Sequence, residues 1–241
     1  MHNFQNHTNI ILGSQSPRRK EILNSLGISK FTQITSPFDE DTFTKFFKSQ
    51  MSALEFISKC CQGKADALAE KLLINIKEAA AGDYSASSNT QGDNARKYWN
   101  PENHSQTLLI TADTMAVDHN DEKYGKPEDK HDALKMLKTL RSNPHKIVTA
   151  VSLLLIDHKS IKIEKRCNFI ESSTVTFRSD ITDLQLAEYV DSGEPMGKAA
   201  SYGYQGMGAF LIEKIEGDYW NIVGLPGSRL VAEINKILLD G

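Results

Sequence analysis

A chain of 241 residues, of which 39% are hydrophobic and 24% charged, has the composition of an ordinary globular protein. This length is enough to bury one large hydrophobic core or two modest ones. The net charge of −3 excludes a general electrostatic attraction to nucleic acid or to an anionic membrane, so any basic site must be local. We therefore expect neither a nucleic acid nor a membrane as a partner.

The cysteines indicate a reducing compartment. There are three of them, Cys60, Cys61 and Cys167, which is an odd number, and adjacent cysteines rarely pair with each other. Residues 1–9 are polar and unlike a signal peptide, and no apolar run approaches the ~18–20 residues needed to span a bilayer. We expect a cytoplasmic protein in which Cys60 and Cys61 fill a core rather than bind a metal.

The first structured segment predicts a strand, a tight turn and a helix. Ile10 to Leu12 is a short apolar run, and Gly13 with Ser14 interrupts it. Ser16 is a suitable N-cap, and Pro17 suits the first helical position because its missing N–H has no partner there. Apolar residues at helical spacing follow, and a glycine suited to ending the helix comes after them (Ile22, Leu23, Leu26 and Gly27).

Two arginines in the first turn of that helix are electrostatically unusual. A helix N-terminus already carries partial positive charge, so Arg18 and Arg19 are mildly unfavourable there unless an anion is present. Free backbone N–H groups, the hydroxyls of Ser14 and Ser16, and two guanidinium groups together suit a phosphate. The alternative interpretation is a solvated helix start that happens to be basic.

The next segment predicts a second strand at Phe31 to Ser36, which leads into an acidic turn over residues 37–41. A carboxylate there, such as Glu40, could bind a divalent cation or accept a hydrogen bond from a base, but a solvated loop explains it equally well. Residues 50–81 have apolar residues at helical spacing and predict a long helix. By itself, Lys64 in this helix would be interpreted as a surface lysine.

Residues 82–106 are rich in Ser, Asn, Gly and Asp and predict a mobile surface insert rather than a domain. A buried strand is predicted at residues 107–112, and Asp113 and Thr114 come directly after it. A carboxylate at the end of a parallel strand lies where α/β proteins place ligands, and it can hold a metal or orient water. A capping or turn aspartate is the simpler alternative.

The remaining elements follow from periodicity and turn residues. Residues 124–127 form a turn that presents Lys126, and residues 132–140 predict an amphipathic helix. Segments 145–156 and 161–177 predict antiparallel neighbours, and we assign His145 a structural role. Thr182 and Gln185 form a capping box for a helix at 183–191, and a segment with six glycines follows at 193–210.

Five of these segments together resemble the Maf family of nucleoside triphosphate pyrophosphatases. They are Ser14-Gln15-Ser16-Pro17-Arg18-Arg19, Ala112-Asp113-Thr114, Gly125-Lys126-Pro127, the glycine-rich segment 193–210 and the segment 215–226. The resemblance runs from about Ile10 to Leu239 and is interrupted mainly by the insert. The sequence departs from the family at Gly197, where Asp is usual, and at Ala200, where Gly is usual.

The resemblance implies roles for individual residues. Asp113 is the proposed general base, Lys64 and Lys126 contact the substrate phosphates, and Lys198, Tyr202 and Gln205 lie at the nucleobase end of the pocket. The triphosphate would be surrounded by Ser14, Arg18, Arg19, Lys64 and Lys126. The cofactor would be a divalent cation, Mg²⁺ or Mn²⁺, held by phosphate oxygens with Glu40, Asp113 or both.

The expected fold class is α/β: one domain over residues 1–241, with an elongated mixed β-sheet and flanking helices in two lobes around a cleft. The resemblance implies an inosine-triphosphatase-like fold and a homodimer. In the family, Arg18, Thr114 and Gln205 accompany the branch that hydrolyses dTTP and UTP. The alternatives are a 7-methyl-GTP pyrophosphatase of the same family and a catalytically weak nucleotide-binding regulator of cell division. The chain has no Walker-type Gly-Lys-Ser/Thr loop.

Overall fold

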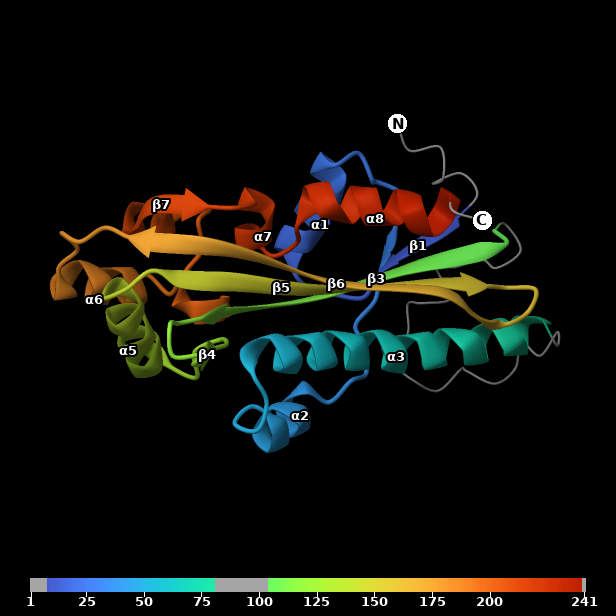
Figure 1. The fold of residues 1–241 in the computed structure, drawn as a ribbon, viewed down its shortest axis with the longest axis horizontal. Helices are drawn as coiled ribbons and strands as arrows, with labels where there is room; N and C mark the ends of the chain where they lie inside the picture. The colour runs from blue at the N-terminus through green and yellow to red at the C-terminus, as the bar shows by residue number, and fades with distance from the viewer. Residues whose placement is uncertain (1–7, 81–103, 240–241) are drawn as a thin grey trace.

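The computed structural model describes residues 8–80 and 104–239, which form an elongated mixed sheet covered by helices (Figure 1). Seven strands lie in one sheet, in the order β2-β1-β3-β5-β6-β7, and β4 pairs with β3 off this path. The strands are β1 (Thr8–Leu12), β2 (Thr32–Gln33), β3 (Gln106–Val117), β4 (Lys123–Tyr124), β5 (His145–Asp157), β6 (Lys162–Phe177) and β7 (Ile212–Glu216).

Parallel and antiparallel pairing are combined around β3. β1 is parallel to both β2 and β3, with Ile11 opposite Leu109, whereas β3 pairs with β5 in antiparallel register along its whole length. β5 and β6 are the predicted antiparallel neighbours, and β7 extends the sheet beyond β6. Because β3, β5 and β6 are long, they connect the two ends of the molecule (Figure 1).

Helices cover both faces of the sheet because successive residues of its buried strands point to opposite sides. Ile11 and Leu109 pack against α3 (Ala53–Ala80), while Ile10 and Leu12 pack on the side of α1 (Pro17–Ser25) and α8 (Gly227–Leu239). α3 and α8 therefore lie on opposite faces of the sheet, as Figure 1 shows.

A separate apolar core lies at the other end of the long strands. It contains residues of α5 (Lys130–Arg141) and α6 (Asp183–Asp191), together with Tyr202 and the ends of β5 and β6. His145 is buried there, its Nε2 lies 2.6 Å from the Tyr202 hydroxyl oxygen, and burial lowers its pKa to about 4. The predicted structural role of His145 is therefore confirmed.

Three predictions about elements were wrong. The strand expected at Phe31 to Ser36 contains only the two residues of β2. The acidic turn after it leads directly into α2 (Glu40–Phe47), because the Asp39 side chain accepts a hydrogen bond from the Thr42 N–H and caps that helix. Asp113 lies inside β3 rather than after it, since β3 continues to Val117.

Other boundaries agree with the predictions. The capping box of Thr182 and Gln185 is present, and Gly27 and Gly193, both with positive φ, follow α1 and α6. Most of the predicted insert, residues 81–103, lies outside the described residues, and its last residue, Gln106, begins β3. Within residues 8–80 and 104–239, no helix is long and apolar enough to cross a membrane.

Candidate active site

The candidate site lies where one edge of β3 loses its strand neighbour. β1 ends at Leu12, opposite Ile110, and β4 pairs with β3 only from Ala116 onward. In the part of the chain that the structure describes, residues 111–115 therefore have no paired strand on this edge. This is the carboxyl end of the parallel strand β1, where α/β sheets commonly bind ligands. Asp113 was correctly expected at such an edge, although it does not end its own strand.

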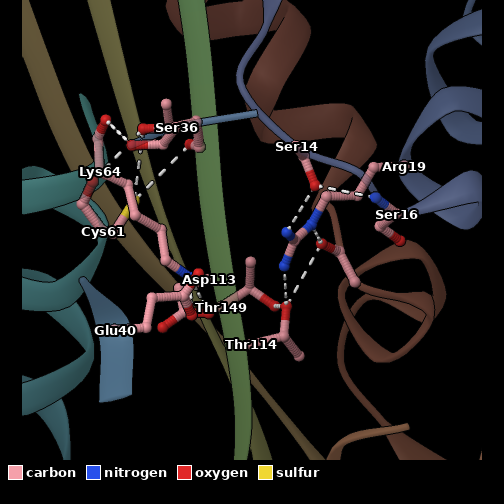
Figure 2. A network of polar contacts seen from close by, with 12 residues as sticks. Ser14, Ser16, Arg19, Ser36, Glu40, Cys61, Lys64, Asp113, Thr114 and Thr149 are labelled. Carbon is pink, nitrogen blue, oxygen red and sulfur yellow. Dashed lines mark hydrogen bonds and ion pairs between the residues drawn. The ribbon is translucent and has the colours of Figure 1, made fainter. Parts of the chain in front are cut away.

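Asp113 and Thr114 point to opposite faces of the sheet because they are consecutive in β3. Figure 2 shows the two polar clusters that result, one on each side of the strand. Asp113 meets Lys64 of α3, whereas Thr114 meets Arg19 of α1. The open edge of β3 thus has a cationic side chain on each side.

The turn before α1 places Arg19. Gly13 is required by packing, since a Cβ there would lie 2.6 Å from Cγ2 of Thr111. The Ser16 side chain makes no capping hydrogen bond, contrary to prediction; instead, the Ser14 hydroxyl oxygen accepts from the Ser16 N–H at 3.2 Å. The first turn of α1 contains no acidic residue, so its N-terminal charge is not offset locally.

Three hydrogen bonds hold the Arg19 guanidinium in place. Nη1 donates to the Ser14 hydroxyl and Nη2 to the Thr114 hydroxyl, each at 3.0 Å, and Nε donates to the Gly224 carbonyl at 2.9 Å. The Thr114 hydroxyl oxygen also lies 3.0 Å from that of Thr149. Burial lowers the Arg19 pKa, yet an arginine remains protonated at neutral pH. Two further N–H groups of this fixed cation remain for an anionic ligand.

Lys64 is brought to Asp113 by close packing on α3. A Cβ at Gly63 would lie 2.4 Å from the Phe38 ring, so glycine lets the segment before α2 rest directly on α3. The Ser36 hydroxyl also donates to the Lys64 carbonyl at 2.8 Å. These contacts place Glu40 at the Lys64 ammonium, which lies 2.7 Å from Glu40 Oε2 and 2.9 Å from Asp113 Oδ1.

This three-membered cluster is only partly accessible to water. The Lys64 side chain is 8% exposed and that of Asp113 20%, whereas Glu40 is 55% exposed. Burial acts to raise the Asp113 pKa, but the charges of Lys64 and Arg19 outweigh it and lower the pKa. Burial conversely acts to lower the Lys64 pKa, and the neighbouring carboxylates raise it above its ordinary value. At neutral pH the cluster therefore contains one ammonium and ionised Asp113.

The glycine-rich segment lies near Arg18. The space beside Gly203 is bounded by the Lys198 side chain and by Nη1 of Arg18, 3.5 Å from where a Cβ would be. Lys198 forms an ion pair with Glu194 at 2.9 Å. Gln205 is exposed. Tyr202 is only 5% exposed and its hydroxyl contacts His145, so its side chain supports this segment from within the core.

Lys126 is exposed on the turn after β4. That turn is attached to the glycine-rich segment, because the Ala200 N–H donates to the Gly125 carbonyl at 2.8 Å. Two surface hollows of about 370 and 400 Å³ lie elsewhere, beside α5 and between α3 and β6. None of the predicted site residues, all of which lie in the described segments, lines either hollow, so the predicted cleft stays a prediction.

Three residues at the site were not found from the sequence. Cys60 is buried close to Asp113, and burial raises the thiol pKa, so the thiol stays protonated. Thr149 supports Thr114 from β5, and Glu194 binds the glycine-rich segment. Only Glu194 carried a signal, as an acidic residue at the start of that segment. The other two depend on strand register and helix packing.

The donor set of the site suits a divalent cation only in part. Glu40 and Asp113 provide hard carboxylate oxygens, which Mg²⁺ and Mn²⁺ prefer. However, residues 8–80 and 104–239 contain no group of three or more His, Cys, Asp or Glu residues that could hold a metal ion. The two carboxylates therefore fit a cation whose remaining ligands are water and substrate oxygens, and do not form a complete metal site by themselves.

The fold and the site define a mixed α/β protein with an acid on an open strand edge and a cation on each side of it. The family model for Maf-like proteins matches residues 9–237, and the chain belongs to the Maf family. The predicted resemblance is thereby confirmed.

Curated relatives match almost the whole chain. The chain is 34% identical over 232 residues to a dTTP/UTP pyrophosphatase of Clostridium botulinum (strain Okra / Type B1), which covers 96% of both proteins. It is 31% identical over 228 residues to a dTTP/UTP pyrophosphatase of Geobacillus sp. (strain WCH70), which covers 95% of this chain and 97% of the relative. A solved nucleoside-triphosphatase / dITP/XTP pyrophosphatase from Mycobacterium abscessus aligns over 97% of this chain at 9% identity with a TM-score of 0.35, which is too weak a likeness to support a conclusion.

Proposed function

We propose that this protein is a nucleoside triphosphate pyrophosphatase that hydrolyses dTTP and UTP to the nucleoside monophosphate and pyrophosphate. One observation carries the proposal: Asp113 lies on an open strand edge between Lys64 and Arg19, which come from different helices on opposite faces of the sheet. Membership of the Maf family and the names of its curated relatives support the same activity. The compartment we propose is the cytoplasm, and the assembly a homodimer.

The triphosphate would bind along the open edge of β3. Ser14, Arg18, Arg19 and the free N–H groups at the start of α1 would bind its phosphates from one side, and Lys64 from the other. Lys126 would approach from the turn after β4. These cations would stabilise the negative charge that grows on the departing pyrophosphate, which is where electrostatic catalysis is most effective.

Glu40 and Asp113 would hold Mg²⁺ or Mn²⁺ together with phosphate oxygens. A bound cation of this kind supplies charge neutralisation at the reacting phosphate. Asp113 would accept a proton from the water that attacks the α-phosphorus, while the bond from that phosphorus to the bridging oxygen of the β-phosphate breaks and pyrophosphate leaves. The low pKa of Asp113 makes it a weak base as long as its ion pair with Lys64 and the nearby charge of Arg19 are not offset. A polyanionic substrate that attracts both cations would raise that pKa.

The preference for pyrimidines would depend on Gln205. Its amide can donate one hydrogen bond and accept another, which matches the N–H and carbonyl groups of uracil or thymine. Gly203 is two residues before Gln205, and Arg18 lies beside it. Arg18 would therefore connect the phosphate end of the site to the base end.

Pyrophosphate release from dTTP, UTP, dGTP and 7-methyl-GTP, measured with and without Mg²⁺, tests the proposal. We expect turnover of dTTP and UTP that depends on the divalent cation. A preference for 7-methyl-GTP would overturn the substrate assignment. Nucleotide binding without any pyrophosphate release would overturn the enzymatic activity and favour a binding regulator.

A further inference from the structure

A single carboxylate organises the glycine-rich segment. Glu194 accepts four hydrogen bonds, of which two come from backbone N–H groups: Met207 at 2.9 Å and Gly208 at 3.1 Å. The others come from the Lys198 ammonium at 2.9 Å and the Tyr189 hydroxyl at 3.2 Å. One side chain thus connects α6, which contains Tyr189, to Lys198, Met207 and Gly208, which lie on both sides of Gln205.

The segment between these contacts is tightly folded. Gly206 has a φ of 88°, and a Cβ there would lie 3.0 Å from Glu194 Oε2. A Cβ at Gly208 would lie 2.5 Å from the Gly203 carbonyl oxygen and 2.6 Å from the Tyr189 hydroxyl. Because glycines have more conformational freedom than other residues, residues 203–208 need an anchor from elsewhere in the chain to keep one conformation. The Glu194 carboxylate is the anchor that the structure supplies.

The carboxylate is fully ionised in this setting. Burial acts to raise the Glu194 pKa, but the hydrogen bonds from Lys198 and from the backbone of Met207 and Gly208 outweigh it and lower the pKa to about 2. All four partners are donors, and an ionised carboxylate is the one side chain that only accepts. The Glu194 side chain is 22% exposed, so these bonds are partly shielded from competing water.

We propose that Glu194 is a positioning residue for nucleobase selection: it fixes residues 203–208 and thereby holds Gln205 in the orientation that reads the base. Glu194 does not itself touch the substrate. Its second effect is on Lys198, which the ion pair holds against Gly203 instead of leaving it extended into solvent. The inference depends on the proposed function, since it requires that the base is bound beside this segment.

The variant Glu194→Gln tests this role with minimal change of shape. A glutamine amide replaces one accepting oxygen by a donating NH₂ group, so at least one of the four donors must face another donor. Glu188→Gln, the same substitution on the preceding helix α6, is the matched control, because Glu188 is exposed. Both variants and the wild type are assayed with dTTP and dGTP, and hydrogen exchange is followed over residues 203–211.

Glu194→Gln should lower the preference for dTTP over dGTP, measured as the ratio of their kcat/KM values, by about tenfold or more. The loss should come mainly from a higher KM for dTTP, because Gln205 is no longer held in place to bind the base. Exchange over residues 203–211 should become faster, and Glu188→Gln should match the wild type in both measurements. An unchanged ratio, or an equal loss of kcat for both nucleotides, would overturn the inference and leave the proposed function intact. If the wild-type protein does not discriminate between bases, the inference about Glu194 is overturned. If the wild-type protein releases no pyrophosphate, the proposed function is overturned together with the inference.

Discussion

Replacing Asp113 by asparagine separates catalysis from binding. The amide keeps the shape and one accepting oxygen for Lys64, but it cannot take a proton from water. General-base catalysis is typically worth about 10²–10⁴-fold, so kcat for dTTP should fall by at least about 10². Removing a negative charge from beside the phosphates also removes a repulsion. A non-hydrolysable dTTP analogue, titrated without Mg²⁺, should therefore bind Asp113→Asn as tightly as wild type or more tightly.

The same variant should be only modestly less stable. Hydrogen bonds to charged groups contribute about 1.5–3 kcal/mol, and Lys64 keeps its contact with Glu40, so we expect a loss of about 1–2 kcal/mol in unfolding free energy. For a chain of this size, that lowers Tm by about 2–8 °C, measurable by calorimetry or urea unfolding.

Asp66→Asn is the matched control. Asp66 is on the same helix as Lys64, is 55% exposed and forms a surface ion pair with Arg166. Such pairs contribute about 0–1 kcal/mol, so this variant should unfold and turn over almost as the wild type does. Loss of a general base predicts that kcat of Asp113→Asn falls at least about 10²-fold. A kcat within about threefold of wild type would refute the assignment of Asp113 as the general base. Equal losses of kcat and binding would instead indicate a structural role.

Two further changes test the cation and the distal core. Arg19→Lys keeps the charge but cannot bond to Ser14, Thr114 and the Gly224 carbonyl at once, so kcat/KM for dTTP should fall at least about tenfold. The control Arg166→Lys should have no effect on kcat/KM. Equal behaviour of the two variants would contradict the role of the Arg19 hydrogen bonds. His145 is buried and its pKa is lowered to about 4, so the unfolded chain binds this proton more readily and stability should fall as the pH drops from about 6.5 to about 4. Urea unfolding across that range should show a weaker pH dependence for His145→Gln, and an unchanged slope would exclude this histidine as its source.

Local sequence signals predicted the elements that depend on local physics. The α1 start, the capping box of α6 and the apolar period of α3 each follow from residues within a few positions of one another. The strand around β2 was predicted too long and the helix α2 was missed, although its Asp39 cap is local. The packing of Phe38 against Gly63, which places the segment before α2 on α3, depends on a tertiary contact. Gly63 reads in the sequence only as a helix-weakening residue.

At the candidate site, too, some features were predictable from the sequence and others were not. The residue types were predictable because a basic helix start and an isolated carboxylate suggest phosphate chemistry, and the family resemblance added Lys64 and Lys126. The register was not predictable. That Asp113 and Thr114 face opposite sides of β3, one toward Lys64 and one toward Arg19, follows from strand pairing and from where β1 ends. The burial of Tyr202 was not predictable either, because a tyrosine within a glycine-rich segment gives no sign of whether it points into a core.

The arrangement links substrate binding to the base strength of Asp113. Lys64 and Arg19 lower the pKa of this carboxylate in the structure, and they are also the cations that would bind the phosphates. A triphosphate that draws their charge toward itself removes the main cause of the low pKa and adds negative charge nearby, so both changes raise the pKa. Apart from the opposing charge of a bound divalent cation, Asp113 would then be a weak base without substrate and a stronger one with it. The effect also requires that the substrate reaches both cations, which is why the ending of β1 at Leu12, where the edge of β3 opens, matters as much as the identity of the side chains.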